Sequence, residues 1–196
     1  MEAAASVLGT ALARLDADRR VRHQALHDPL TGLPNRALLV DRLGHALARS
    51  RREGTRVGAI FVDLDHFKAV NDRLGHEAGD ELLGQVAARL QAVVRADETL
   101  ARLGGDEFIV VTPCEGDPAS LLLRAERLRT ALGEPFALTA GEHRLDASLG
   151  VAVAAPDDDG AALVRDADAA MYRAKQLGRG RSELYRGGRG RVIARS

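Results

Sequence analysis

RLGGDEF, residues Arg102 to Phe108, is the most informative stretch of this chain. Two apolar runs, Leu100 to Leu103 and Phe108 to Val111, flank its Gly-Gly pair, which is the pattern of a β-hairpin whose tight turn needs positive φ. Glycines at the tip remove side chains, so a bulky ligand can lie against the backbone. Because Asp106 and Glu107 follow the pair directly, the sequence predicts two carboxylates at a hairpin tip.

A second acidic stretch lies upstream, where a predicted buried strand, Arg56 to Leu64, carries Asp63 near its end. Carboxylates brought together from neighbouring strands form a cluster of hard oxygen ligands suited to magnesium. We expect Asp65 to point away from Asp63 and assign it no metal role. Acids beside a bare turn indicate nucleotide-phosphate chemistry.

Length and composition set the limits of the interpretation. A chain of 196 residues supports one domain with short extensions, and its net charge of zero gives the whole molecule no electrostatic footprint for nucleic acid or membrane. The single cysteine, Cys114, agrees with a reducing compartment, and we expect it to be a small buried or edge residue. No apolar run approaches membrane-spanning length. We therefore expect a cytoplasmic protein without nucleic-acid partners or direct membrane contact.

Four sequence blocks stand out between about Asp28 and Arg181. They are DPLTGLPNR (Asp28 to Arg36), DLDHFKAVNDRLGHEAGDELL (Asp63 to Leu83), RLGGDEF (Arg102 to Phe108) and MYRAKQLGRGR (Met171 to Arg181). In order and spacing these blocks together resemble the GGDEF domain of diguanylate cyclases, which condense two GTP into cyclic di-GMP. One departure is Gly180, where the family commonly has asparagine after the arginine.

The coarse pattern predicts an α+β fold, a ferredoxin-like or palm βαββαβ core with a mainly antiparallel central sheet flanked by helices. The resemblance implies the same palm-like fold. The expected helices and strands follow in chain order. They are a helix 36–52 with Asn35 as N-cap, the strand 56–64, a helix 77–95, the hairpin, a helix 118–132, strands 136–138 and 143–154, a helix 161–176 and a short strand 182–185.

Three segments are expected: an N-terminal signalling helix and linker (1–27), the GGDEF domain (28–186) and an Arg/Gly-rich tail (187–196). The first segment resembles the junction where a GAF-type sensor runs into a GGDEF domain. Its apolar stripe fits a dimer seam or packing on the domain, and both alternatives stay open. The parent protein is therefore expected to have a sensor domain upstream, and a further domain downstream is compatible with the sequence.

The resemblance implies roles for the acids. Asp63 and Asp106 match the family's metal ligands for Mg²⁺ or Mn²⁺, with the Leu64 carbonyl as a backbone ligand. Asp106 also matches the proposed proton acceptor, and Glu107 is expected to tune or share the site. An alternative without any metal role is that acidic residues simply favour exposed turns. That preference would explain one of these acids, but not Asp63 together with both hairpin carboxylates.

Other positions match the family's substrate contacts. Lys68, one of only two lysines in the chain, matches a phosphate contact that stabilises the transition state. Lys175 and Arg179 match ligands of the terminal phosphates, and Gly104 and Gly105 form the bare turn against the substrate. Asn71 and Asp80 match the residues of the family that bind guanine. A carboxylate such as that of Asp80 accepts hydrogen bonds from guanine N1–H and the exocyclic amine but repels the unprotonated N1 of adenine, which favours GTP over ATP.

The leading hypothesis is an active diguanylate cyclase that binds GTP and works as a homodimer, since each domain binds one GTP and two must face each other. The alternative is a non-catalytic regulatory module that binds GTP or cyclic di-GMP. Arg95 and Glu98 occupy the register of the family's Arg-x-x-Asp product site, with glutamate in place of aspartate. We expect weak product inhibition there. The other interpretation is a solvated ion pair between Arg95 and Glu98 at a helix end.

Overall fold

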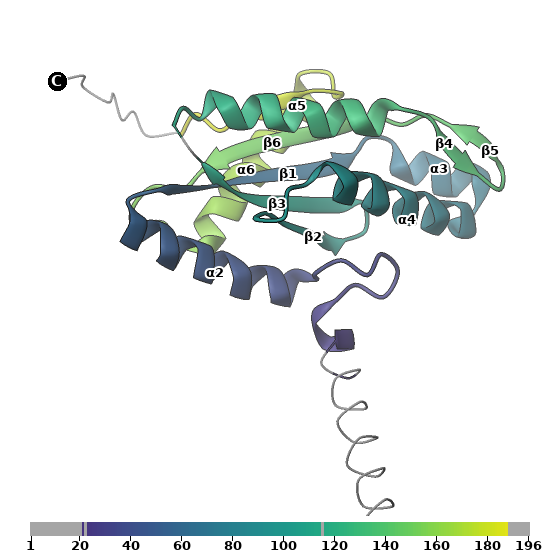
Figure 1. Ribbon diagram of the computed structural model, residues 1–196. Coiled ribbons are helices and arrows are strands. Elements are labelled where there is room, and N and C mark those ends of the chain that lie inside the picture. The colour runs from purple at the N-terminus through teal and green to yellow at the C-terminus, as the bar shows by residue number, and fades with distance from the viewer. Residues whose placement is uncertain (1–20, 22, 115, 188–196) are drawn as a thin grey trace, which may run out of the picture.

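The computed structural model describes residues 21, 23–114 and 116–187. Five strands form a central sheet with helices on both faces, and a small two-stranded ribbon projects from one end (Figure 1). The predicted stripe in residues 1–20 and the tail after 187 lie outside the described residues. The predicted α+β class with a mainly antiparallel sheet is confirmed.

The sheet is built around β1 (Arg56–Leu64), and its strand order is β2-β3-β1-β6-β7. The strand β1 runs antiparallel to both β3 (Glu107–Cys114) and β6 (Ala147–Val153), whereas β7 (Ser182–Leu184) pairs in parallel with β6. The hairpin forms as predicted from β2 (Thr99–Gly104) and β3. Since β1 is central, its end lies beside the hairpin tip.

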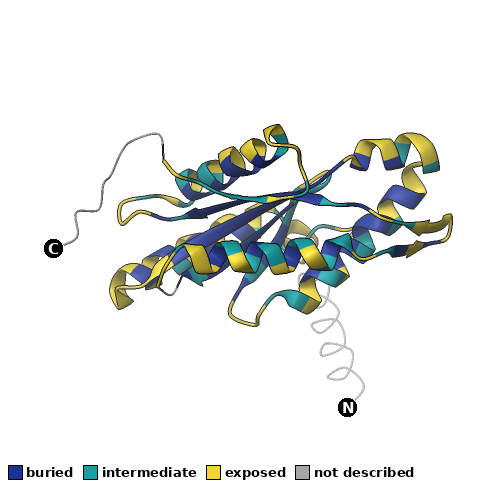
Figure 2. Cartoon of the chain, turned by 90° about the horizontal axis from the view of Figure 1, so that it is seen from above, coloured by how far each residue is buried: buried dark blue, intermediate teal, exposed yellow. Residues whose placement is uncertain are grey.

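Alternating residues of β1 supply two separate cores, which explains why the strand is apolar throughout. Ile60 and Val62 pack in a cluster with α4 (His76–Val93) and α5 (Ala119–Gly133). Ala59 and Phe61 pack on the opposite face with α2 (Arg36–Glu53) and α6 (Gly160–Gln176). Figure 2 shows the buried strands between helices whose outer faces are exposed. The result is a helix–sheet–helix sandwich that holds the strand ends rigidly.

Local signals place the helices where the sequence predicts most of them. The predicted N-cap Asn35 accepts hydrogen bonds from the backbone N–H groups of Ala37 (2.9 Å) and Leu38 (3.2 Å), and Gly54 ends α2 in the left-handed conformation. The sequence pattern assigns no element to residues 65–76, where the structure has the helix α3 (Phe67–Leu74). Its apolar residues Phe67, Val70 and Leu74 recur at helical spacing and pack on the core.

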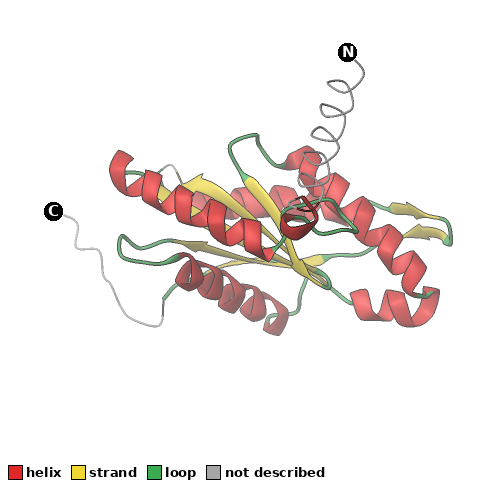
Figure 3. Cartoon of the chain, turned by 90° about the horizontal axis from the view of Figure 1, so that it is seen from below, coloured by secondary structure: helices red, strands yellow, loops and turns green. Residues whose placement is uncertain are grey.

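The predicted strand 143–154 is wrong in its extent. His143 ends β5 (Gly141–His143), which pairs with β4 (Phe136–Leu138) in the projecting ribbon, and β6 begins only at Ala147. Between them Asp146 accepts from the N–H of Ala147 with its own carboxylate (2.8 Å), which ends the extended run. Figure 3 shows the short ribbon beyond the main sheet, separated from it by loop.

Two further features are the single cysteine and the apolar character of the helices. Cys114 is buried, as predicted, and burial raises the pKa of its thiol. Among the described residues, no helix combines the length and the apolar character that crossing a bilayer requires.

Candidate active site

The end of β1 and the hairpin tip form one continuous backbone surface. Asp63 pairs across the sheet with Glu107, and the N–H of Leu64 donates to the carbonyl of Asp106 (3.3 Å). At the turn, Gly104 and Gly105 have φ of 142° and 51°, a region that favours glycine. The structure therefore brings Asp63, Leu64, Asp106 and Glu107 together, as the strand and hairpin pattern predicts.

A half-buried arginine, Arg102, connects this turn to the loop that precedes α2. The guanidinium of Arg102 donates to the carbonyl of Gly105 (2.7 and 3.1 Å) and to the carboxylate of Asp28 (2.9 Å). Thr31 donates to the same carboxylate oxygen through its N–H (2.8 Å) and its hydroxyl (2.7 Å). Burial alone would raise the pKa of Asp28, but the hydrogen bonds from Thr31 and Arg102 outweigh it and hold the pKa below its ordinary value. The loop thus fixes the position of the hairpin turn.

The acids at the tip repel one another in a poorly solvated place. Burial raises the pKa of Asp63, whose side chain is only 10% exposed, and the charge of Asp106 adds to that rise against the opposing effect of Lys175. Burial also raises the pKa of Glu107, assisted by the charges of Asp63 and Asp168 and opposed by Arg36. This crowd of negative charge favours the binding of a cation.

The C-terminal end of α6 supplies positive charge to these acids. Lys175 Nζ lies 2.6 Å from Asp63 Oδ2, and one turn later Arg179 Nε lies 3.9 Å from Asp65 Oδ1. The expectation that Asp65 points away from Asp63 is wrong. The charge of Asp65 acts on the pKa of Asp63, and the two carboxylates pair with Lys175 and Arg179, which lie at and just after the C-terminal end of α6. Lys175 and Arg179 are therefore placed beside the acids.

The corner between α3 and α4 holds the remaining predicted substrate residues. Lys68 and Asp80 are exposed, while Asn71 is half-buried beside α4. A side chain on Gly79 would place its Cβ 1.8 Å from Asn71 Oδ1. The absence of a side chain at Gly79 therefore makes the space that the Asn71 carboxamide fills. Both residues predicted to bind guanine lie at this corner, one on each helix.

The donors at the tip suit a hard cation, although no part of the chain that the structure describes holds three or more His, Cys, Asp or Glu side chains arranged as a metal site. The predicted set of Asp63, Asp106 and the Leu64 carbonyl needs only two carboxylates and one backbone oxygen. All three donors are oxygens, the type that Mg²⁺ prefers, and the ion completes its shell with water and substrate phosphates.

The predicted product-binding residues, Arg95 and Glu98, have different surroundings in the structure. The Glu98 carboxylate is fully buried and accepts hydrogen bonds from Arg124, from the hydroxyl of Thr112 (2.6 Å) and from the backbone N–H of Arg95 (2.8 Å). The alternative of a solvated ion pair between Arg95 and Glu98 is wrong, since the charge partner of Glu98 is Arg124. The Arg95 side chain instead lines an open pocket of about 290 Å³ together with Arg124 and Arg127.

Sequence reasoning missed two groups near the site. The pair of Asp28 and Arg102 joins residues 74 apart, and no local pattern could have revealed it. Arg36 and Asp168 act on the pKa of Glu107 from α2 and α6. Arg36 ends the first motif block and Asp168 lies three residues before the last one, and this proximity to the motifs is the signal that could have identified them.

Comparisons with known proteins agree with this geometry. The family described as "Diguanylate cyclase, GGDEF domain" matches residues 25–181. The bifunctional diguanylate cyclase/cyclic di-GMP phosphodiesterase MucR of Pseudomonas aeruginosa is 47% identical over 180 residues, covering 91% of this chain and 26% of MucR. This chain thus spans about a quarter of that protein's length.

Solved structures give the same result. The GGDEF domain of TpbB from Pseudomonas aeruginosa has a TM-score of 0.77 at 39% identity, covering 81% of this chain and 94% of that one. The coiled coil and GGDEF domain of DgcB from Caulobacter crescentus, solved with cyclic di-GMP, has a TM-score of 0.84 at 30% identity, covering 93% of this chain and 98% of that one. The chain therefore belongs to the GGDEF domain family of diguanylate cyclases.

Proposed function

We propose that this chain condenses two molecules of GTP into cyclic di-GMP and releases pyrophosphate. The observation that carries the proposal is the cluster at the hairpin tip, where Asp63 and Glu107 have raised pKa values beside Asp106 and Lys175. Such a crowd of acids next to a glycine turn is suited to a metal–triphosphate complex rather than to an uncharged ligand.

The donor set fits Mg²⁺ or Mn²⁺, which Asp63, Asp106 and the Leu64 carbonyl would hold. When bound, such an ion lowers the pKa of a sugar hydroxyl and neutralises charge on the triphosphate. Asp106 accepts the proton of the attacking 3′-hydroxyl, and Glu107 shares the charge of the site. The chain supports both tasks because Arg102 fixes the carbonyl of Gly105, the residue before Asp106.

The basic residues act on the phosphates. Lys68, exposed in the first turn of α3, contacts the phosphate at which charge develops. Lys175 and Arg179 bind the terminal phosphates, which leave as pyrophosphate. The ion pair of Lys175 with Asp63 supports this role, because the ammonium lies beside one of the acids that would hold the metal–triphosphate complex.

Guanine recognition falls to Asn71 and Asp80 at the α3–α4 corner. We expect Asp80→Ser to reduce discrimination against ATP, because it removes the acceptor that repels adenine N1. A mixed GTP/ATP assay measures the effect, with Asp72→Ser, another exposed acid on α3, as the matched control. Unchanged selectivity in the Asp80 variant would make Asp80 only an acid in the first turns of a helix.

Turnover requires a homodimer, since each chain binds one GTP and the two must face each other. Incubating the chain with GTP and MgCl₂ and separating the nucleotides tests the whole proposal. Cyclic di-GMP should form, and activity per mole should fall on hundredfold dilution. GTP binding without turnover at any concentration would instead support the alternative, a regulatory module that binds GTP or cyclic di-GMP without catalysis.

Product inhibition belongs to the same proposal. The pocket beside Arg95 is lined by three arginines, Arg95, Arg124 and Arg127, and by one acid, Asp97, and this excess of positive charge suits a phosphate-rich ligand. Since Glu98 is enclosed by its own partners, we expect weak inhibition that depends on Arg95. Titrating cyclic di-GMP against the wild type, Arg95→Ala and Glu98→Asp decides it. Identical curves for all three proteins would remove the product site.

The parent protein is proposed to be multidomain, with a sensor upstream and a further domain possible downstream. MucR is about four times as long as the region that matches this chain, which is consistent with that organisation. A cytoplasmic location is part of the same proposal. Fractionating cells that express the parent protein tests it.

A further inference from the structure

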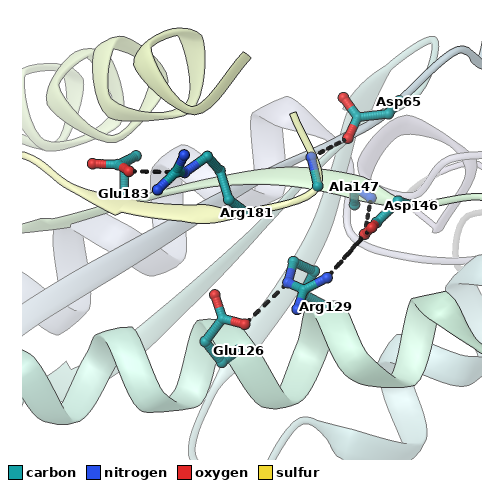
Figure 4. Close-up of polar contacts among 8 residues, drawn as sticks. Asp65, Glu126, Arg129, Asp146, Ala147, Arg181 and Glu183 are labelled. Carbon is teal, nitrogen blue, oxygen red and sulfur yellow. Dashed lines mark hydrogen bonds and ion pairs between the residues drawn. The ribbon is translucent and has the colours of Figure 1, made fainter. Parts of the chain in front are cut away.

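Asp65 is a buried acid that the proposed chemistry does not use. It follows the last residue of β1, and its side chain is only 3% exposed. One carboxylate oxygen accepts from the hydroxyl of Ser148 on β6 (2.8 Å), and the other accepts from the N–H of Gly180 (2.9 Å). Figure 4 shows Asp65 reaching the chain that follows α6. A buried carboxylate thus connects the end of β1 to a loop more than 100 residues away.

That loop has a backbone that needs external support. Arg179 has a φ of 62°, in the left-handed region that costs an L-residue about 1 kcal/mol or more. Its N–H donates to the carbonyl of Ala174 (3.1 Å), and the next N–H, of Gly180, is the one that Asp65 binds. A Cβ on Gly180 would lie 2.7 Å from Asp146 Oδ2, so the loop packs closely on its neighbour. The Asp65 bond therefore holds the backbone on the C-terminal side of Arg179.

The same carboxylate acts on the Arg179 side chain. Arg179 Nε lies 3.9 Å from Asp65 Oδ1, the oxygen that Ser148 orients, while the side chain is 49% exposed. Lys175 and Arg179 thus face Asp63 and Asp65 respectively, as two neighbouring ion pairs. An exposed arginine with one buried charge beside it keeps a preferred direction, whereas without that charge it samples many rotamers.

We propose that Asp65 is a positioning residue, which holds Arg179 in place for the terminal phosphate of GTP. The inference rests on the proposed function, from which the phosphate role of Arg179 comes. Asp65 itself contacts neither substrate nor metal in this scheme. Its contribution is to reduce the conformational freedom that Arg179 loses when a triphosphate binds.

The test compares ligands with and without the terminal phosphate. The probes are the methylene-bridged analogues of GTP and GDP, in which the α–β oxygen is replaced so that no turnover occurs, titrated with Mg²⁺ by calorimetry. Asp65→Asn, which keeps the shape and loses the charge, should weaken binding of the triphosphate about tenfold. Binding of the diphosphate should change by less than about twofold. A residue that only stabilised the fold would not change this ratio.

Two further variants keep the result interpretable. Arg129→Met removes the ion pairs of Arg129 with Glu126 and Asp146, beside the same loop (Figure 4), and should lower the melting temperature without changing the ratio. Ser148→Ala removes only the hydroxyl that orients Asp65. If Asp65→Asn does not fold, Ser148→Ala should still change the ratio in the same direction, by about threefold.

A double-mutant cycle locates the effect. In an Arg179→Ala background, Asp65→Asn should leave the triphosphate preference unchanged, because the group that it positions is gone. Equal loss of both ligands in Asp65→Asn, or an undiminished effect without Arg179, would overturn the positioning role. Failure of the wild type to bind either analogue would instead count against the proposed function itself, so the two failures are distinguishable.

Discussion

The β2–β3 hairpin carries acids at both of its ends, and the surroundings of these acids differ. At the open end, Glu98 precedes β2 and is enclosed by Arg124, Thr112 and a backbone N–H. At the turn, Asp106 and Glu107 face Asp63, and burial and mutual repulsion raise the pKa of both Asp63 and Glu107. One end thus satisfies its carboxylate, whereas the other leaves charge in excess.

The difference separates acids that hold the fold from acids that await a ligand. A buried carboxylate surrounded by donors is part of the architecture, and removing it leaves its partners unsatisfied. A buried carboxylate beside other carboxylates costs stability, which the protein recovers only when a cation binds. Substitution of an acid at the turn should therefore lower activity without lowering stability. Substitution of Glu98 at the open end should lower stability.

The largest expected effect is the loss of activity in Asp63→Asn. The substitution removes one negative charge from the proposed metal site without a change of volume, and formation of cyclic di-GMP should fall by about a thousandfold or more. Because burial makes the charged Asp63 unfavourable, the melting temperature without metal should stay the same or rise. Nucleotide chromatography and a melting curve measure both, with the exposed Asp41→Asn as control. Near-normal turnover by Asp63→Asn would contradict the assignment of Asp63 as a metal ligand.

At the other end, Glu98→Gln should cost stability. The half-buried Arg124 guanidinium loses its charge partner, which is expected to lower the free energy of unfolding by about 2 kcal/mol. Urea unfolding measures this loss. A stability equal to that of the wild type would show that the enclosed carboxylate is dispensable to the fold.

A smaller effect is expected at Asp28, a second satisfied acid. A pKa held below its ordinary value of 3.8 stabilises the fold above that pH, and this stability is lost as the pH falls through the folded-state pKa. Asp28→Asn should thus be less stable than the wild type at pH 7, by about 1 kcal/mol, and the difference should shrink below about pH 4. Urea unfolding from pH 7 to pH 3 measures the slope, and a difference independent of pH would contradict it.

The sequence contained most of this site but not the distinction between its acids. The hairpin pattern and the strand ending at Asp63 predict that Asp63, Asp106 and Glu107 meet, because both signals are local. The enclosure of Glu98 depends on Arg124, which lies 26 residues away on another element. No periodicity encodes such a pair. The sequence therefore predicts either a product ligand or a surface ion pair at Glu98, whereas the structure encloses its carboxylate with Arg124, Thr112 and a backbone N–H.

Errors in the fold have equally local causes. The sequence analysis gives Lys68 and Asn71 as substrate contacts and assigns no helix to residues 67–74, although Phe67, Val70 and Leu74 follow helical spacing. The strand 143–154 was joined across Asp146, whose side chain caps its own neighbour. Both signals lie within the segments they define, as do the patterns that predict the central strand and the long helices.

The smallest expected effect, and the sharpest contrast with Asp28, is the pH dependence at Glu107. Its pKa is raised above the ordinary value of 4.5, so the ionised carboxylate destabilises the fold at neutral pH. As the pH falls through the raised pKa, the folded state takes up the proton first and the cost disappears. Glu107→Gln should therefore be slightly more stable than the wild type at pH 7, and the advantage should vanish towards pH 4. Chelator-treated protein unfolded in urea across this range gives the slope, which must have the opposite sign to that of Asp28→Asn. Slopes of the same sign would mean that the turn satisfies its acids as the open end does, and the cation site at the hairpin tip would lose its electrostatic basis.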